Sequence, residues 1–210
     1  MMDSNDDIDD KIVKVLSFHN NYAQQLQEAL SKINHDQIIE ATKLLYWAAL
    51  NNFPVYVFGN GGSASLSEHF SCDHTKGVRY NTGLRPNIIS LSSNIPMITA
   101  IANDISYDEI FSVQLDSFPS YGAVAIGISA SGNSRNVCRG LQKAQGKGYQ
   151  TLAFVGFDGG HIMEYNDAKS FVYVPSNNYG IVEDCHQIIM HSIAQFFRTT
   201  FYNNKNELRL

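Results

Sequence analysis

The sequence predicts an α/β protein in which helices cover both faces of a doubly wound, five-stranded parallel sheet. Short, continuous apolar runs such as residues 55–58 fit strands that are buried on both faces. Segments with helical spacing separate these runs, and regular alternation of strand and helix is typical of parallel α/β folds. The predicted strands cover residues 55–58, 88–91, 123–129, 151–157 and 171–174.

Two helices are expected ahead of the first strand. Residues 1–10 have the composition of an acidic tail, and apolar residues then recur with helical spacing over residues 11–33. A second helix is expected over residues 36–52, with Asp36 as its N-cap. We expect these helices to form a hairpin, and appended amphipathic helices often pack against another subunit.

The remaining helices are expected between and after the strands. No internal repeat or linker interrupts the pattern, so one domain is expected over residues 1–210. Its tail and hairpin occupy residues 1–52, and its α/β core occupies residues 53–202. The helices expected in the core cover residues 63–76, 95–103, 107–118, 134–147, 160–166 and 182–202.

Composition excludes several classes of function. The net charge of −5 gives no electrostatic reason to expect nucleic-acid binding. No apolar run approaches the roughly 20 residues that cross a bilayer, and the acidic N-terminus is unlike a secretory signal. We therefore expect a cytoplasmic protein with neither a nucleic-acid nor a membrane partner. Cys72, Cys138 and Cys185 are scattered, which favours buried or half-buried free thiols over a zinc finger or a disulfide framework.

Two loops carry a composition suited to binding phosphate. The first spans Gly59–Ser63 and the second spans Ser129–Ser134, and each follows a predicted strand and opens a helix. Glycine lets the backbone approach an anion closely, and a helix N-terminus offers free N–H groups and a favourable dipole. Since ligands bind beyond the carboxyl ends of parallel strands, the two loops could hold one phosphate from both sides.

Two other interpretations of these loops compete with phosphate binding: a dinucleotide site, and ordinary turn and capping chemistry. Gly59, Gly61 and Ala64 match the dinucleotide motif G-x-G-x-x-A, but the second predicted strand ends without the carboxylate that would hold a ribose. Ordinary turn and capping chemistry explains one serine-rich loop easily. It explains two loops at parallel positions poorly, so phosphate binding is favoured.

Histidines and acids recur on two predicted helices. His69 and Asp73 are four residues apart and therefore share one helix face, and Glu183, Gln187 and His191 form a stripe on the last helix. Such groups suit a zinc-type divalent ion. They equally suit general acid–base catalysis without metal, and solvated helix faces with a histidine and an acid are common.

Taken in order, these motifs resemble the sugar isomerase (SIS) domain family, and within it the bacterial phosphoheptose isomerases. The resemblance runs from about residue 36 to residue 200. It rests on residues 59–64, His69-x-x-x-Asp73, residues 99–104, residues 127–134, residues 158–160, residues 174–176, residues 183–186 and His191.

The resemblance implies a flavodoxin-like three-layer sandwich and an aldose–ketose isomerase. Its substrate would be sedoheptulose 7-phosphate, converted through an enediol into D-glycero-D-manno-heptose 7-phosphate for lipopolysaccharide or capsule synthesis. The resemblance also implies a homotetramer with active sites at subunit contacts. Two alternatives remain open: an isomerase of a different phosphosugar, and a non-catalytic regulatory protein that binds one.

The resemblance also assigns roles to individual residues. Asp73 and His191 fall on the acid–base pair. Zinc or another divalent metal would be held by His69, Asp73, Glu183 and His191. The substrate and its phosphate would be bound by Asn60, Gly61, Gly62, Ser63, Asn103, Asp104, Ser129, Ser131, Ser134 and Glu183.

Two of these positions depart from the family pattern. Asp73 stands where the family usually has glutamate, and Glu183 stands where it usually has glutamine. The shorter Asp73 side chain moves the carboxylate back by about 1 Å, a displacement that can cost about a hundredfold in rate. Glu183 adds a negative charge at the expected metal position. These departures could mark another substrate, a metal-dependent variant or a decayed activity.

Overall fold

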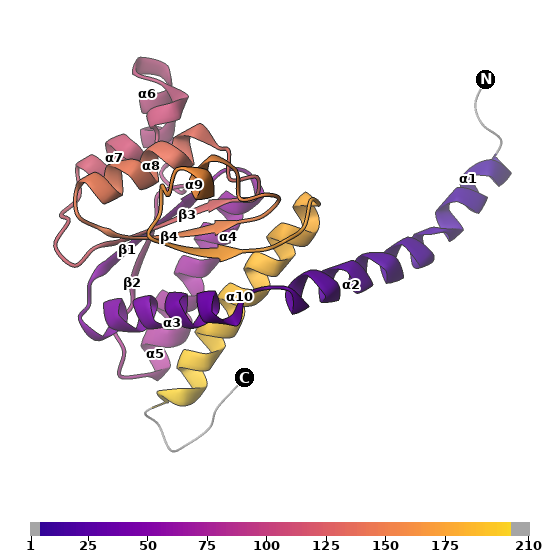
Figure 1. Cartoon of the computed structure of the whole chain (residues 1–210), viewed down its shortest axis with the longest axis horizontal. Helices are drawn as coiled ribbons and strands as arrows, with labels where there is room; N and C mark the ends of the chain where they lie inside the picture. The colour runs from indigo at the N-terminus through magenta and orange to yellow at the C-terminus, as the bar shows by residue number, and fades with distance from the viewer. Residues whose placement is uncertain (1–4, 203–210) are drawn as a thin grey trace.

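The centre of the molecule is a five-stranded parallel sheet with the order β2-β1-β3-β4-β5, which confirms the predicted fold (Figure 1). The structure is a computed structural model that describes residues 5–202. Each predicted strand is present, with bounds that shift by two residues or fewer. The strands are β1 (Pro54–Gly59), β2 (Asn87–Ser90), β3 (Val124–Ser129), β4 (Gln150–Val155) and β5 (Ser170–Tyr173).

Burial on both faces explains why the strands are continuously apolar. In β1, Val55 and Val57 join the core on one face of the sheet, whereas Tyr56 and Phe58 join the core on the other. All four side chains are at most 2% exposed. Because successive strand residues point to opposite faces, a strand covered on both sides has no polar positions to spare.

Helices cover the two faces of the sheet (Figure 1). One layer contains α3 (His35–Leu50), α4 (Gly62–Cys72), the π-helical turn η1 (Asp73–Val78), α5 (Arg79–Asn81) and α10 (Tyr179–Thr200). The other contains α6 (Ile95–Asp104), the 3₁₀ turn η2 (Tyr107–Glu109), α7 (Ser112–Asp116), α8 (Arg135–Gly146) and α9 (Gly160–Glu164).

The segment expected as one helix over residues 107–118 is instead two short pieces. Ser106 adopts an extended conformation and its side chain accepts a hydrogen bond from the Asp108 N–H, which caps the 3₁₀ turn. α7 then starts only at Ser112. Serine side chains commonly compete in this way with regular helical bonding.

The N-terminal helices differ from the expectation in three ways. Residues 5–10 are helical rather than a tail, and the expected helix over residues 11–33 is divided into α1 (Asn5–Val13) and α2 (Val15–Ser31). Residues 1–4 lie outside the described part of the chain. Both helical segments are present, but they diverge: α2 projects from the body while α3 lies along the sheet (Figure 1).

Asn34, rather than Asp36, is the N-cap of α3. Its side chain accepts a hydrogen bond from the Asp36 N–H, and its backbone is extended, as capping requires. Asp36 instead lies in the first turn, where its charge suits the helix dipole. α10 likewise begins earlier than expected, at Tyr179, because Asn178 caps it.

The burial of the cysteines and the character of the helices can be compared with two further expectations. Cys138 and Cys185 are buried free thiols, as expected, whereas Cys72 is exposed. Within residues 5–202, no helix combines the length and apolar character needed to span a bilayer.

Candidate functional site

The two predicted phosphate loops meet at the point where the strand order changes direction. β1 lies between β2 and β3, and Gly59 at its end pairs with Ile128 of β3. The Asn60 side chain exchanges two hydrogen bonds with Asn136 of α8, at 2.8 and 2.9 Å. The loop after β1 is therefore tied to the helix that follows the serine loop, at the place where doubly wound sheets bind ligands.

The serine loop is held in a compact turn. The Ser129 hydroxyl donates to Ser134 at 3.1 Å, and the Gly132 N–H donates to the Ser129 carbonyl at 3.0 Å. Gly132 has φ of +68°, and a Cβ there would lie 2.0 Å from the Gly159 carbonyl oxygen. Only glycine fits this conformation and this approach. Ser131 and Ser134 are partly accessible, so their hydroxyls border the loop opening.

The segment after α6 contributes a residue that sequence reasoning missed. The Tyr107 hydroxyl donates to Asn60 Oδ1 at 3.1 Å, beside the glycine loop. Asn103 and Asp104, the predicted substrate residues at the end of α6, are exposed and hydrogen-bonded to each other at 2.7 Å. A tyrosine in a short 3₁₀ turn gives no sequence signal, and neither does Asn136 inside α8.

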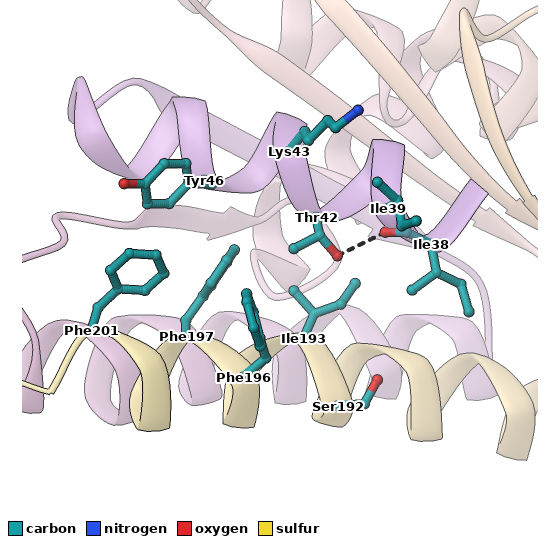
Figure 2. A pocket seen from close by; sticks show the side chains of 10 residues that line it. All are labelled: Ile38, Ile39, Thr42, Lys43, Tyr46, Ser192, Ile193, Phe196, Phe197 and Phe201. Atoms are coloured by element: carbon teal, nitrogen blue, oxygen red, sulfur yellow. Dashed lines mark hydrogen bonds between the residues drawn. The ribbon is translucent and has the colours of Figure 1, made fainter. Parts of the chain in front are cut away.

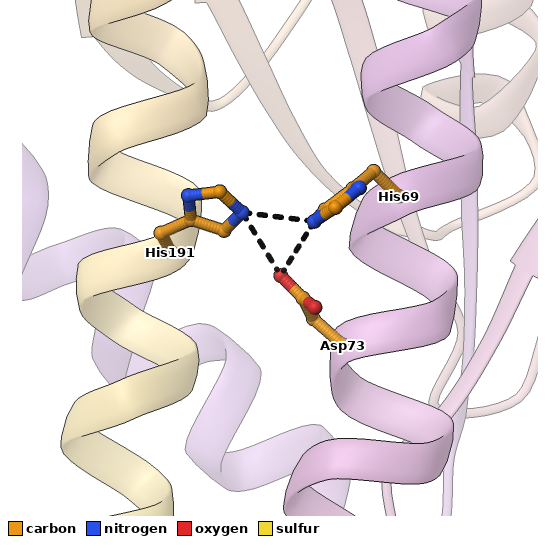
Figure 3. Close-up of side chains that lie close together, drawn as sticks. All are labelled: His69, Asp73 and His191. Atoms are coloured by element: carbon orange, nitrogen blue, oxygen red, sulfur yellow. Dashed lines mark hydrogen bonds and ion pairs between the residues drawn. The ribbon is translucent and has the colours of Figure 1, made fainter. Parts of the chain in front are cut away.

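His69, Asp73 and His191 come together between α4 and α10 (Figure 3). The two imidazole Nε2 atoms are 2.9 Å apart. Asp73 Oδ2 lies 3.5 Å from His69 Nε2 and 3.4 Å from His191 Nε2. His191 is 118 positions from Asp73 and 122 positions from His69, so the fold brings two distant helix faces together in one cluster.

The helix type changes at Asp73. α4 ends at Cys72, and Asp73 opens the π-helical turn η1. π-helical turns are rare and occur often at functional sites. The sequence predicted an uninterrupted helix here, because no residue type in the segment indicates a π-helical turn.

Glu183 does not join the cluster. Its carboxylate instead lies over Gly62, where an added Cβ would be 2.4 Å from Oε2. Gln187, one turn further along α10, takes the neighbouring place, with its Nε2 2.7 Å from His191 Nε2. The structure therefore brings together three of the four predicted metal ligands. Glu183 faces the glycine loop, the other part of the predicted site.

Solvent reaches the cluster easily. The side chains of His69 and His191 are 53% and 45% exposed, and that of Asp73 is 28% exposed. A pocket of about 190 Å³ beside it is lined by Asp73, Gly77, His191, Ala194, Gln195 and Arg198. A larger, apolar pocket lies elsewhere, between α3 and α10 (Figure 2).

The donor atoms of the cluster suit a divalent metal. Two imidazole nitrogens and one carboxylate oxygen are a ligand set that zinc accepts in catalytic sites, which keep a further position open. The three donor atoms lie within 3.5 Å of one another. The residues present therefore fit a metal of this class.

A sequence model of the SIS domain family matches residues 19–156. The chain belongs to the SIS domain family. This SIS domain is 34% identical over 188 residues to the phosphoheptose isomerase of Colwellia psychrerythraea, a match that covers 87% of this chain and 94% of the relative. It is 33% identical over 195 residues to that of Helicobacter pylori strain P12, covering 92% and 97%.

Structural comparison agrees with the sequence relationship. The phosphoheptose isomerase of Neisseria gonorrhoeae superimposes with a TM-score of 0.80 at 25% identity. The superposition covers 90% of this SIS domain and 99% of that chain. All three of these relatives, each matched over most of this SIS domain, are named phosphoheptose isomerases.

In this SIS domain the Glu183 carboxyl has a shifted pKa. Burial, with a smaller contribution from the neighbouring Asp184, raises the pKa of the Glu183 carboxyl. The carboxylate lies at Gly62, the first residue of α4. A helix N-terminus favours an anion, so Glu183 occupies a position that also suits a phosphate or a sugar oxygen.

Proposed function

We propose that this protein is an aldose–ketose isomerase that converts sedoheptulose 7-phosphate into D-glycero-D-manno-heptose 7-phosphate. The observation that carries the proposal is the convergence of His69, Asp73 and His191 in a fold whose relatives are named phosphoheptose isomerases. A heptose phosphate of this kind would supply lipopolysaccharide or capsule synthesis. Sugar phosphates do not cross membranes unaided, so we place the reaction in the cytoplasm.

The phosphate is assigned to the two loops at the change in strand order. Ser63, Ser129, Ser131 and Ser134 supply hydroxyls, and Asn60, Gly61 and Gly62 supply polar or close-fitting backbone. Holding the phosphate at one end of the sugar fixes where its C1 and C2 atoms lie. Asn103 and Asp104 are assigned to the sugar hydroxyls.

Asp73 and His191 are assigned to the proton transfers. Conversion of ketose to aldose moves a hydrogen from C1 to C2 and a proton from the C1 hydroxyl to the C2 oxygen, through an enediol. One of the two residues moves the carbon-bound proton, and the other moves the hydroxyl proton. Their side chains meet at 3.4 Å, so both can reach adjacent atoms of one substrate.

Zinc or a similar ion is assigned to His69, Asp73 and His191. When bound, such an ion supplies Lewis-acid polarisation of a carbonyl oxygen. Gln187, whose amide lies 2.7 Å from His191, orients that imidazole. Glu183 approaches the substrate from the glycine loop, and we assign it to sugar binding.

We also propose that the protein works as a homotetramer with its active sites at subunit contacts. The projecting helices expose Ile12, Leu16 and Phe18, each 59–70% accessible. An apolar groove of about 570 Å³ lies between α3 and α10, where Phe196 and Phe197 face Tyr46 (Figure 2). Exposed apolar surface of this kind commonly marks a protein contact, and a second copy would also shield the open histidine cluster.

The oligomer is tested by sedimentation of wild type against Leu16→Asp. The matched control is Gln25→Asp, an equally exposed position on α2. We expect a tetramer for wild type and control, and smaller species for Leu16→Asp. A monomeric wild type would refute this part of the proposal.

The activity is tested by following aldose formation from sedoheptulose 7-phosphate by NMR. Wild type is compared with Asp73→Asn and with the control Glu68→Gln, an exposed carboxylate on α4. Each protein is assayed after chelation and again with added zinc. We expect conversion by wild type and control, and loss in Asp73→Asn. Absence of conversion by wild type under both conditions would refute the proposal.

A second candidate is isomerisation of a different phosphosugar, favoured by the Glu183 carboxylate over Gly62. A negative charge there changes which sugar oxygens the glycine loop accepts. A panel of pentulose, hexulose and heptulose phosphates in the same assay separates the two. A higher kcat/KM for a pentulose or hexulose phosphate would support this candidate.

A further inference from the structure

A second cluster of metal-type ligands lies on the opposite layer of the molecule. Cys138 comes from α8, His161 from α9, and Asp167 from the segment before β5. One ligand atom from each lies within 4.8 Å of the other two. His161 Nδ1 is 2.9 Å from Asp167 Oδ2, and the Cys138 thiol lies against the same carboxylate.

Within residues 5–202, the buried Asp167 carboxylate has a histidine, rather than a lysine or arginine, as its ion-pair partner. Its side chain is only 3% exposed. Its hydrogen-bond partners are the Gln142 amide, at 2.8 Å, and His161. Neither partner is permanently charged, and buried carboxylates are normally paired or bound to a metal. Its counter-charge is therefore the His161 imidazole when that ring is protonated, and a bound cation would supply a positive charge at the same place.

We propose that Cys138, His161 and Asp167 bind a divalent transition-metal ion of the zinc class, at a site separate from the His69 cluster. Thiolate, imidazole and carboxylate are the three ligand types that zinc prefers. In tetrahedral coordination their donor atoms are roughly 3.3–3.8 Å apart, which small side-chain adjustments within the 4.8 Å cluster provide. His161 is 43% exposed on its side chain, so water can take the fourth position.

Binding exchanges protons for the ion. Burial, with a further contribution from Asp167, raises the pKa of the Cys138 thiol to about 12, so the free site carries S–H. On binding, the thiol releases its proton to solvent and the thiolate becomes a ligand. His161 binds the ion through Nδ1 as a neutral imidazole whose single proton is on Nε2, so the ring need release no proton of its own.

The position of the site points to a structural role behind the serine loop. The His161 N–H donates to Asn133 Oδ1 at 2.9 Å, and the Ile162 N–H donates to the Gly132 carbonyl at 3.0 Å. The Cys138 sulfur lies 3.9 Å from the same carbonyl. An ion held by the cluster would therefore join α8 and α9 at the loop assigned to phosphate.

Cobalt(II) titration of the metal-free full-length chain tests the proposal. Cobalt bound by a thiolate absorbs strongly in the near ultraviolet, whereas histidine and carboxylate ligands do not produce this band. The His69 cluster contains no thiol and is therefore silent. A Cys72→Ser background removes the exposed thiol next to Asp73, and buried Cys185 serves as an internal control.

We expect a saturable band in Cys72→Ser, lost when Cys138→Ser is added. Asp167→Asn and His161→Ala should each weaken cobalt binding by at least about tenfold. These two variants decide the matter if Cys138→Ser fails to fold. No band in Cys72→Ser at millimolar cobalt, or an unchanged band in Cys138→Ser, would overturn the proposal. Neither result depends on isomerase activity.

Discussion

Two helical segments each carry one exposed and one buried histidine. The first is α4 with the η1 turn that follows it, and the second is α10. In the first, His69 is 53% exposed on its side chain, and His74, on η1, is 1% exposed. In α10, His191 is 45% exposed on its side chain, and His186 is fully buried. Five residues separate the members of each pair, so they point in different directions around the helix.

This comparison shows that residue type alone does not mark a site. His69 and His191 meet each other and Asp73, in reach of solvent. His74 and His186 each have one nitrogen at a backbone carbonyl, Phe70 and Val155, while the other nitrogen is buried without a partner. The first pair is available for chemistry, and the second pair contributes to the core.

Replacing one exposed histidine is the most direct test of the difference in role between the exposed pair and the buried pair. We expect His191→Ala to lower kcat by about 10²–10⁴-fold, because a proton-transfer group is lost. Its stability should change by less than about 0.5 kcal/mol, as for other exposed substitutions. Steady-state kinetics and urea unfolding measure the two effects, with the exposed His35→Ala as control. A kcat loss below tenfold would contradict the assignment.

The buried histidines should make stability depend on pH. Burial lowers the pKa of both His74 and His186 to about 4. In the unfolded chain these two histidines bind protons near pH 6.5. The free energy of unfolding therefore has its full value above that pH and falls as pH decreases toward 4. Each histidine accounts for roughly 3 kcal/mol of this loss. Urea unfolding between pH 7.5 and pH 4 measures it.

A substitution isolates the contribution of His186. His186→Leu should reduce the loss of stability on acidification, even if its stability at pH 7.5 is lower because the bond to Val155 is gone. His35→Leu is the matched control and should keep the full wild-type dependence. Equal pH dependence in wild type and His186→Leu would show that His186 does not titrate as inferred.

The smallest expected effect is a change in KM on substitution of Glu183, which lies on α10 with His186 and His191. We expect Glu183→Gln to raise KM by about two- to tenfold, equivalent to about 1 kcal/mol, because an amide at Gly62 accepts a hydrogen bond from a sugar hydroxyl less strongly than a carboxylate does. kcat should change less than in His191→Ala. Steady-state kinetics of the isomerisation measure both KM and kcat. A lowered KM would instead indicate that the Glu183 carboxylate repels the anionic substrate.

Much of the site could be predicted because its parts are local. Gly59–Ser63 and Ser129–Ser134 each follow an apolar strand, and the spacing of His69 and Asp73 places them on one helix face. Asn136 and Tyr107 could not be found in this way. Their partner Asn60 is distant in sequence, and each lies in a segment without special composition.

The sequence by itself determined the order of strands and helices, the two loops and the residues that resemble the SIS family. These features depend on neighbours along the chain and on the repeat of strand and helix. Only the tertiary structure decided that Gln187 rather than Glu183 lies beside His191, and that Cys138, His161 and Asp167 come together. Those outcomes depend on how each helix is rotated against its neighbours, and packing between distant segments sets that rotation.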